Sequence, residues 1–368
     1  MRTIKIRLFP TVEQEHLMNK HIGCSRFIWN WGLAYQKEQY ASTGKKLSCF
    51  DLIKQLTPLK KIPEYTWLNE VSNATLQTVL QDLDKAYTSF FKGAGFPKFK
   101  SKKRSKRVYP LRSDCVSIEE GFVKIAKLGK VAIKTTPNLT KIYNPRITRT
   151  PNNKWILTVS YERENQAPAL TDKSMGIDLG VKSLATVAFD DEMLTYGNIN
   201  KTANVRKLEK KRERLQRSIS RKYVQNRSYS KSKHILKSEQ QLRELNYHLS
   251  NIRKDYIHKT THELTSLLPR AVVMEDLNVS GMMKNRHLSK AIQEQCLYKF
   301  IRQMKYKCED AGIEFKQVDK FYPSSKKCSH CGEIKQDLKL KDRTYVCPHC
   351  GFSIDRDYNA AINLRNCA

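Results

Sequence analysis

Long hydrophobic runs are missing from this sequence. The longest purely apolar stretches are short, as at Ala271–Met274, whereas a helix that crosses a bilayer needs about 18–20 apolar residues. We therefore expect no membrane insertion. Residues 1–7 alternate charged and apolar side chains without a continuous apolar segment. This pattern excludes a secretory signal peptide, so we expect the protein to stay inside the cell.

Acidic residues are scarce relative to basic ones. The 368 residues include 68 Lys and Arg but 36 Asp and Glu, which leaves a formal charge of +32. Such a chain gains binding free energy when it neutralises phosphates and releases their counterions. The segment 92–113 contains no acid at all, and a basic run without carboxylates favours phosphate contacts over an ordinary solvated face. Its basic residues are Lys92, Lys98, Lys100, Lys102, Lys103, Arg104, Lys106, Arg107 and Arg112.

Four of the ten cysteines form two Cys-x-x-Cys pairs, Cys328 with Cys331 and Cys347 with Cys350, which are separated by residues 332–346. Two such pairs can present four thiolates tetrahedrally to a metal ion. Zinc is the predicted metal, and iron in a rubredoxin-like site is the alternative. Four protein ligands leave no open position, which predicts a structural role. The other six are expected to be reduced packing residues. They are Cys24, Cys49, Cys115, Cys296, Cys308 and Cys367.

Hydrophobic periodicity predicts a helical segment within a β-rich first half. Residues 3–8 alternate as a strand, Thr11 and Gln14 fit a capping box, and helices are predicted over 11–23, 25–41 and 72–90. Short strands are predicted between 115 and 162. Because a lone N-terminal strand needs a sheet to join, the helical segment is interpreted as an insertion into a β-barrel.

The second half shows an α/β pattern. A three-strand meander is predicted over 175–196, and 271–274 resembles a central strand covered on both faces. Two long antiparallel helices are predicted between 201 and 259, joined by 223–232. A helix over 290–311, the strand 314–318, the cysteine segment and a short helix from Tyr358 complete this half.

Three carboxylates interrupt or follow apolar stretches that are predicted to be core elements. They are Asp178 in Gly-Ile-Asp-Leu-Gly, Glu275 in Val-Met-Glu-Asp-Leu-Asn, and Asp357 in Asp-Arg-Asp-Tyr-Asn-Ala-Ala. Burying a lone charge there would be costly, which predicts a cation partner. Magnesium prefers oxygen ligands, and two such ions can promote phosphodiester hydrolysis. Each acid alone could be an ordinary helix cap or surface charge.

Six motifs together resemble the TnpB family, compact nucleases encoded by bacterial and archaeal insertion sequences and apparent ancestors of type V CRISPR effectors. The resemblance covers nearly the whole chain. The motifs are Ile-Lys-Ile-Arg-Leu-Phe-Pro at 4–10, Phe-Pro-Lys-Phe-Lys-Ser-Lys at 96–102, Gly-Ile-Asp-Leu-Gly at 176–180, Glu-Asp-Leu at 275–277, Ser-Ser-Lys at 324–326 and Asp-Tyr-Asn-Ala-Ala at 357–361.

This resemblance implies an RNase H-like, RuvC-type α/β nuclease core with a zinc-ribbon insertion, preceded by a β-barrel wedge domain that hosts a helical recognition lobe. The implied segments are the wedge domain at 1–10 and 93–166, the helical lobe at 11–92, the nuclease domain at 167–325 and 351–368 with a helical hairpin at 200–268, and the zinc ribbon at 326–350.

The resemblance also implies a function. A guide RNA from the transposon end would direct magnesium-dependent cleavage of double-stranded DNA next to a short element-specific motif. Asp178, Glu275 and Asp357 match the family's metal-binding acids, and Asp355 is assigned a supporting role. A monomer per guide RNA in the prokaryotic cytoplasm, at the nucleoid, is the expected state.

Other functions remain as alternatives at this point. An Asp-Asp-Glu transposase would have Glu last, whereas Glu275 is the middle acid here. A tyrosine transposase needs a metal-binding histidine pair, for which only His258 and His262 offer a hint. A catalytically silent RNA-guided repressor, a transposase accessory protein or a zinc-ribbon RNA-binding factor would have no need of all three acids.

Overall fold

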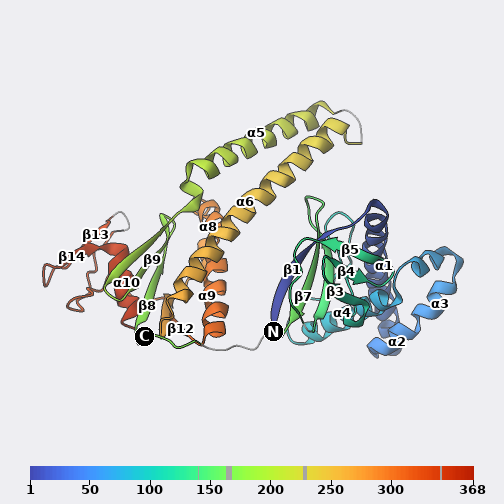
Figure 1. The fold of residues 1–368 in the computed structure, drawn as a ribbon, viewed down its shortest axis with the longest axis horizontal. Coiled ribbons are helices and arrows are strands. Elements are labelled where there is room, and N and C mark those ends of the chain that lie inside the picture. Colours follow the sequence, from blue (N-terminus) through green and yellow to red (C-terminus); the bar gives the residue numbers. More distant parts are fainter. Residues whose placement is uncertain (140, 163–167, 227–229, 340–341) are drawn as a thin grey trace. The chain divides into compact units, whose positions relative to one another are not determined.

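The computed structural model describes residues 1–139, 141–162, 168–226, 230–339 and 342–368 (Figure 1). The chain divides into two compact units, Met1–Glu164 and Asn165–Ala368. The predicted boundary between wedge and nuclease domains, at 166/167, lies outside the described residues. So do residues 227–229 of the predicted helix connection and residues 340–341 of the predicted zinc ribbon.

The N-terminal unit combines one sheet with a group of helices. Its seven strands are all antiparallel and lie in the order β2-β6-β7-β1-β5-β4-β3, so the N-terminal strand does join the sheet. In the described residues no ladder pairs β2 with β3, the two edges, so strand pairing does not close a barrel. The strands are β1 (Arg2–Phe9), β2 (Val108–Pro110), β3 (Val116–Glu119), β4 (Phe122–Ile125), β5 (Gly129–Ile133), β6 (Tyr143–Arg149) and β7 (Trp155–Tyr161).

A long helix joins this sheet to the other helices of the unit. The helices are α1 (Val12–Thr43), α2 (Cys49–Lys54), α3 (Leu56–Lys61), the 3₁₀ segment η1 (Pro63–Glu70) and α4 (Asn73–Phe91), with η2 (Ser113–Cys115) before β3. The first half of α1 packs on the sheet core through Met18 and Ile22, and its second half packs on α4 within a separate helical core.

The predicted helix break at Gly23 is wrong, because α1 is continuous from Val12 to Thr43. A glycine inside a helix costs only about 1 kcal/mol. Here Ile22 is buried in the sheet core and Cys24 in the helical core, so burial on both sides of Gly23 outweighs that cost. The predicted capping box of Thr11 and Gln14 is present at the start of the helix.

The C-terminal unit contains a mixed five-stranded sheet in the order β10-β9-β8-β11-β12. The predicted meander is confirmed as three antiparallel strands, and β11 is parallel to both of its neighbours. The strands are β8 (Ser174–Leu179), β9 (Ser183–Phe189), β10 (Glu192–Gly197), β11 (Ala271–Glu275) and β12 (Glu314–Val318); β13 (Thr344–Val346) and β14 (Ser353–Asp355) form a separate ribbon.

Helices cover both faces of this sheet. One core contains Val272 and Met274 of β11 with side chains of α6, α8 and α9, whereas Val273 packs with Leu364 of α10 on the other face. The prediction that β11 is covered on both faces is confirmed. The helices are the 3₁₀ segment η3 (Ile199–Lys201), α5 (Ala203–Gln225), α6 (Lys233–Ser266), α7 (Val279–Met282), α8 (Ser289–Gln295), α9 (Leu297–Ala311) and α10 (Arg356–Arg365).

Two further helical predictions can be compared with the structure. The two long helices between 201 and 259 are α5 and α6, which pack side by side (Figure 1). The single helix predicted over 290–311 is instead broken at Cys296, whose φ of 56° is left-handed, so α8 ends and α9 begins there.

Among the described residues, no helix is both long and apolar enough to cross a membrane.

Candidate metal centres

Two of the predicted acids lie on neighbouring parallel strands. Asp178 is near the end of β8, and Glu275 is the last residue of β11. The β8–β11 ladder pairs Met274 with Ile177, so one further step along both strands brings Glu275 beside Asp178. Register partners in parallel strands direct their side chains to the same face. The sheet alone therefore places these two carboxylates at one carboxyl-terminal edge.

The third acid, Asp357, is in the first turn of α10 and reaches this edge because α10 packs closely on β8. The packing depends on Gly176, which has no side chain. A Cβ at this position would lie 2.0 Å from the carbonyl oxygen of Ala361 and 2.4 Å from the backbone nitrogen of Arg365. No larger residue fits at 176 unless the helix moves.

Electrostatics show that the three acids share one neighbourhood. Burial raises the pKa of Asp178 well above its ordinary value, and the charges of Glu275 and Asp357 raise that pKa further, while the charge of Arg356 acts in the opposite direction. Crowded carboxylates of this kind favour either protonation or a bound cation. The acids are 97 and 82 residues apart in the sequence, and the fold alone brings them together.

The protein itself supplies partners for two of these acids. Arg356 is 2.9 Å and Arg343 is 4.0 Å from carboxylate oxygens of Asp357. The hydroxyl of buried Ser324 donates a hydrogen bond to Glu275. The sequence predicted no role for Ser324 or for the two arginines. For Ser324, the motif 324–326 is the sequence feature that points to the residue.

The degree of convergence differs between the acids and the cysteines. In the described part of the chain, only the four cysteines have donor atoms that all lie within 4.8 Å of one another. The three carboxylates share an edge but are not gathered that closely. The suggested histidine pair, His258 and His262, is on α6 and forms no such group.

Asp355 occupies a different position from Asp357. It is the N-cap of α10, where its carboxylate accepts hydrogen bonds from the backbone N–H groups of Asp357 at 2.9 Å and Tyr358 at 3.1 Å. An N-cap carboxylate stabilises the start of a helix. Its charge also contributes to raising the pKa of Asp178. Asp355 therefore holds the turn from which Asp357 extends.

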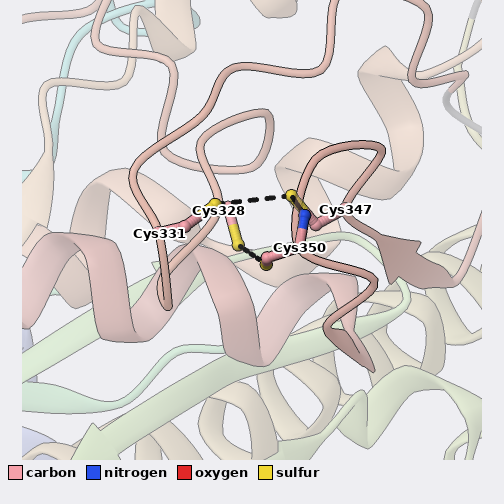
Figure 2. A group of neighbouring side chains, drawn as sticks. All are labelled: Cys328, Cys331, Cys347 and Cys350. Carbon is pink, nitrogen blue, oxygen red and sulfur yellow. Dashed lines mark hydrogen bonds between the residues drawn. The ribbon is translucent and has the colours of Figure 1, made fainter.

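The four predicted cysteine ligands converge (Figure 2). The Sγ atoms of Cys328 and Cys350 are 3.8 Å apart, and those of Cys331 and Cys347 are 3.5 Å apart. A tetrahedral zinc with Zn–S bonds of about 2.3 Å requires S–S separations of about 3.8 Å. The backbone N–H of Cys350 points at the sulfur of Cys347 and lowers the pKa of that thiol. The donor set thus fits a structural zinc ion.

Two buried asparagines join the zinc-binding segment to α10. Asn359 donates to the carbonyl of Lys327 at 2.7 Å and accepts from the backbone N–H of Ser329 at 3.0 Å. Asn363 donates to the carbonyls of Ser324 and Lys327 at 2.8 and 2.7 Å. The same helix therefore bears Asp357 and anchors the first cysteine knuckle. Asn359 belongs to the sequence motif 357–361, but the role of each asparagine is evident only from the folded structure.

Family models match three parts of the chain. A Cas12f1-like TNB domain matches residues 298–364, and a model described as a probable transposase matches residues 158–286. A model described as a helix-turn-helix domain matches residues 1–45. In this protein those residues form β1 and the continuous helix α1 rather than two helices.

Several curated relatives align over nearly the whole chain. A candidate RNA-guided DNA endonuclease of Streptomyces pristinaespiralis is 28% identical, over 99% of this chain and 88% of its own length. The candidate RNA-guided DNA endonuclease InsQ of Escherichia coli (strain K12) is 29% identical, over 99% and 91%. TnpB-like protein L770 of Acanthamoeba polyphaga mimivirus is 25% identical, over 98% and 72%.

The same architecture occurs in a solved structure, the cryo-EM structure of a Cas12f1–sgRNA–target DNA complex. Its Cas12f1 chain superposes with a TM-score of 0.59 at 14% identity, over 99% of this chain and 98% of that chain. At this identity the similarity concerns the fold alone. The full-length relatives and the family models, rather than this structure, support membership of the TnpB family.

Proposed function

We propose that this protein is an RNA-guided DNA endonuclease of a transposable element, which cleaves double-stranded DNA next to a short motif by two-metal-ion hydrolysis. The observation that carries the proposal is the gathering of Asp178, Glu275 and Asp357 at one edge of the sheet. The names of the full-length relatives supply the RNA guide and the DNA target.

The three carboxylates would hold the magnesium ions. Bound there, two ions would activate a water on one side of the phosphodiester and stabilise the leaving oxygen on the other. The protein orients the ligands through its own contacts: Ser324 fixes Glu275, while Asp355 and Arg356 fix the turn that bears Asp357. Burial first, and then the charges of Glu275 and Asp357, raise the pKa of Asp178, and a divalent cation bound there would favour its ionised form.

The basic segments would hold the nucleic acids through backbone contacts. The strip 92–113 belongs to the N-terminal unit, and α5 and α6 extend from the C-terminal unit. Guide and heteroduplex strands are recognised mainly by charge and backbone geometry in such complexes. The zinc ribbon would keep α10 in place, because Asn359 and Asn363 connect the two.

We assign domains on the same basis, with a wedge domain at 1–10 and 93–166, a helical recognition lobe at 11–92, a RuvC-type nuclease domain at 167–325 and 351–368, and a zinc ribbon at 326–350. A monomer bound to one guide RNA, working in the prokaryotic cytoplasm, is the proposed functional state. Light scattering of the purified ribonucleoprotein would measure its stoichiometry.

The decisive experiment is to purify the protein with its co-purifying RNA, sequence that RNA, and incubate the complex with matching duplex DNA and magnesium. Wild type should cleave the duplex, and Asp178→Asn should not. Asp172→Asn is the matched control, since Asp172 is an exposed acid just before β8 and its loss should leave cleavage intact.

Protein stability separates a chemical effect from unfolding. Asp178→Asn removes one of several crowded negative charges, so its melting temperature without magnesium should be no lower than that of wild type. Binding of the target without nicking, equal in wild type and Asp178→Asn, would identify a repressor instead and refute the nuclease proposal.

A further inference from the structure

A basic pocket lies within the N-terminal unit, whereas the residues of both candidate metal centres belong to the C-terminal unit. Its volume is about 330 Å³, and it lies between α1, α4, the segment 100–110 and β6. Six basic side chains and a single acid, Asp82, line it. The basic residues are Arg26, Lys100, Lys102, Lys106, Arg107 and Arg146.

The one acid in this pocket is already paired. Both oxygens of Asp82 accept hydrogen bonds from the guanidinium of Arg146, each at 2.8 Å. Within the described residues, the other five basic side chains have no carboxylate at ion-pair distance. The pocket therefore keeps a charge of +5, from six cations less one carboxylate, and none of it is neutralised by the protein.

Lys100 is partly withdrawn from solvent. Its Nζ lies 3.3 Å from the ring centroid of Trp29. Its backbone is fixed by Asn30, whose side chain accepts from the N–H of Lys100 at 2.7 Å and donates to its carbonyl at 2.9 Å. Burial lowers the pKa of Lys100 to about 8, although the charge of Asp82 acts against this shift. A half-buried ammonium in this setting is stabilised by a bound anion.

A second, independent observation comes from Ser25 of α1, which also lines the pocket. Its side chain is only 5% exposed, and its Oγ has no hydrogen-bond partner in the described part of the protein. Buried hydroxyls almost always have a partner. An anion in the pocket would provide an acceptor for this hydroxyl.

We propose that this pocket binds one backbone phosphate of a nucleic-acid strand, with the ammonium of Lys100 and the hydroxyl of Ser25 as the groups that contact the phosphate oxygens. The inference rests on the proposed function only in naming nucleic acid as the partner. RNA and DNA share the phosphodiester, so the guide and the target are both sources of the same ligand chemistry.

The test measures binding of fluorescein-labelled 20-nucleotide RNA and DNA of one sequence to the full-length protein, over a series of salt concentrations. Lys100→Met removes the charge but keeps the apolar stem beside Trp29. Losing one phosphate contact should reduce the slope of log K against log salt by about 0.7 and weaken binding about fivefold at 0.1 M salt. Lys85→Met is the control, because Lys85 is an exposed residue of α4 that does not line the pocket.

Ser25→Ala supplies a variant in which stability and binding should change independently. Removing an unpartnered buried hydroxyl should not lower the melting temperature of the free protein. Ser25→Ala should nevertheless weaken nucleic-acid binding, and it should do so for the same probe, RNA or DNA, whose binding Lys100→Met weakens. A merely structural role for Ser25 would instead lower the melting temperature and leave the affinity of the folded protein unchanged, which would contradict the proposal.

The pH profile gives a third readout. Raising the pH from 7 to 9 should weaken binding more in wild type than in Lys100→Met, because Lys100 loses its proton in this range. The charged groups around Lys100 are Asp82 of α4, Arg146 of β6, Arg26 of α1 and the neighbouring Lys102, Lys106 and Arg107.

The outcomes identify the strand and separate this inference from the proposed function. A Lys100-dependent slope with the RNA probe alone identifies the guide strand, and one with the DNA probe alone identifies the target. Equal slopes for Lys100→Met and Lys85→Met with both probes would overturn the phosphate site even if wild type cleaves DNA. A slope change in a protein that never cleaves would leave the site standing and refute the nuclease.

Discussion

Replacing Gly176 by alanine tests the packing that brings Asp357 to the other two acids. The new Cβ would lie 2.0 Å from the carbonyl oxygen of Ala361 and 2.4 Å from the backbone nitrogen of Arg365. Both neighbours are backbone atoms of α10, so no side-chain rotation can relieve the clash. Because Cβ atoms essentially never approach such atoms within 3.0 Å, α10 must move away from β8 by about 1 Å.

Two effects of that movement can be estimated. Overpacking a core typically costs 1–3 kcal/mol, and a clash against backbone alone should be near the upper figure. About 3 kcal/mol corresponds to a decrease of roughly 6–12 °C in the melting temperature of a unit of this size. A displacement of about 1 Å at a reacting centre can lower the rate about 100-fold. Cleavage by Gly176→Ala should therefore fall by about that factor even where the protein is folded.

The assay is thermal unfolding of the full chain together with single-turnover cleavage well below the melting temperature. Gly197→Ala is the control, since a Cβ at Gly197 at the end of β10 would meet nothing within 4 Å. If Gly176→Ala melted and cleaved like Gly197→Ala, the tight contact between β8 and α10 would not position Asp357, and this part of the reasoning would be refuted.

Three other predictions concern the zinc site, its connection to α10 and a buried histidine. Cys328→Ser should reduce bound zinc from one ion per chain to none and lower the melting temperature and cleavage together, because a structural zinc contributes folding energy directly. Asn363→Ala should cost about 1–3 kcal/mol, since the Ser324 carbonyl loses the amide that donates to it and the Lys327 carbonyl keeps only Asn359. Burial lowers the pKa of His21, whose Nε2 accepts from the backbone N–H of Ser72. Below about pH 6.5 the unfolded chain binds this proton and the folded chain does not, so stability should fall with decreasing pH by at most about 1.4 kcal/mol per pH unit, and His21→Gln should remove that part of the slope.

Each of these predictions has its own contradicting result. Full cleavage activity after complete zinc removal, measured by metal analysis of the same sample, would deny the ion a structural role. Asn366→Ala changes an exposed residue of the same helix end, and equal stability losses in the two asparagine variants would contradict the role given to Asn363. For the histidine, the free energy of unfolding of wild type and of His21→Gln would be measured at pH 5 and at pH 7.5. If the difference between the two proteins were the same at both pH values, the proton linkage would be contradicted.

The sequence predicted the elements whose signals are local. Alternation and apolar runs identified the meander and β11, and the paired spacing of Cys328, Cys331, Cys347 and Cys350 predicted their convergence. These patterns are sufficient because pleat, burial and ligand geometry each impose a fixed spacing along the chain.

Features that depend on tertiary contacts were not predictable in the same way. The continuity of α1 through Gly23 follows from two separate cores that bury its neighbours. The break at Cys296 lacks any glycine or proline signal, and the ion pair between Arg343 and Asp357 joins segments that only the fold brings together. Sequence motifs predicted the three acids. Their partners, Arg343, Arg356 and Ser324, could not be predicted, because their positions depend on how α10 and the cysteine-rich segment pack against the sheet.

The most direct test of the account is a metal-rescue experiment at the scissile phosphate. In the guided complex, sulfur replaces one non-bridging oxygen of that phosphate, and cleavage is measured with magnesium and with manganese. If Asp178, Glu275 and Asp357 hold ions that contact this oxygen, the sulfur should slow the magnesium reaction strongly, because magnesium prefers hard oxygen ligands, and manganese should restore it. The central claim would be contradicted if, in magnesium, the unmodified DNA and the DNA with sulfur at either non-bridging position were cleaved at equal rates. Undiminished cleavage by Asp178→Asn would contradict it as well.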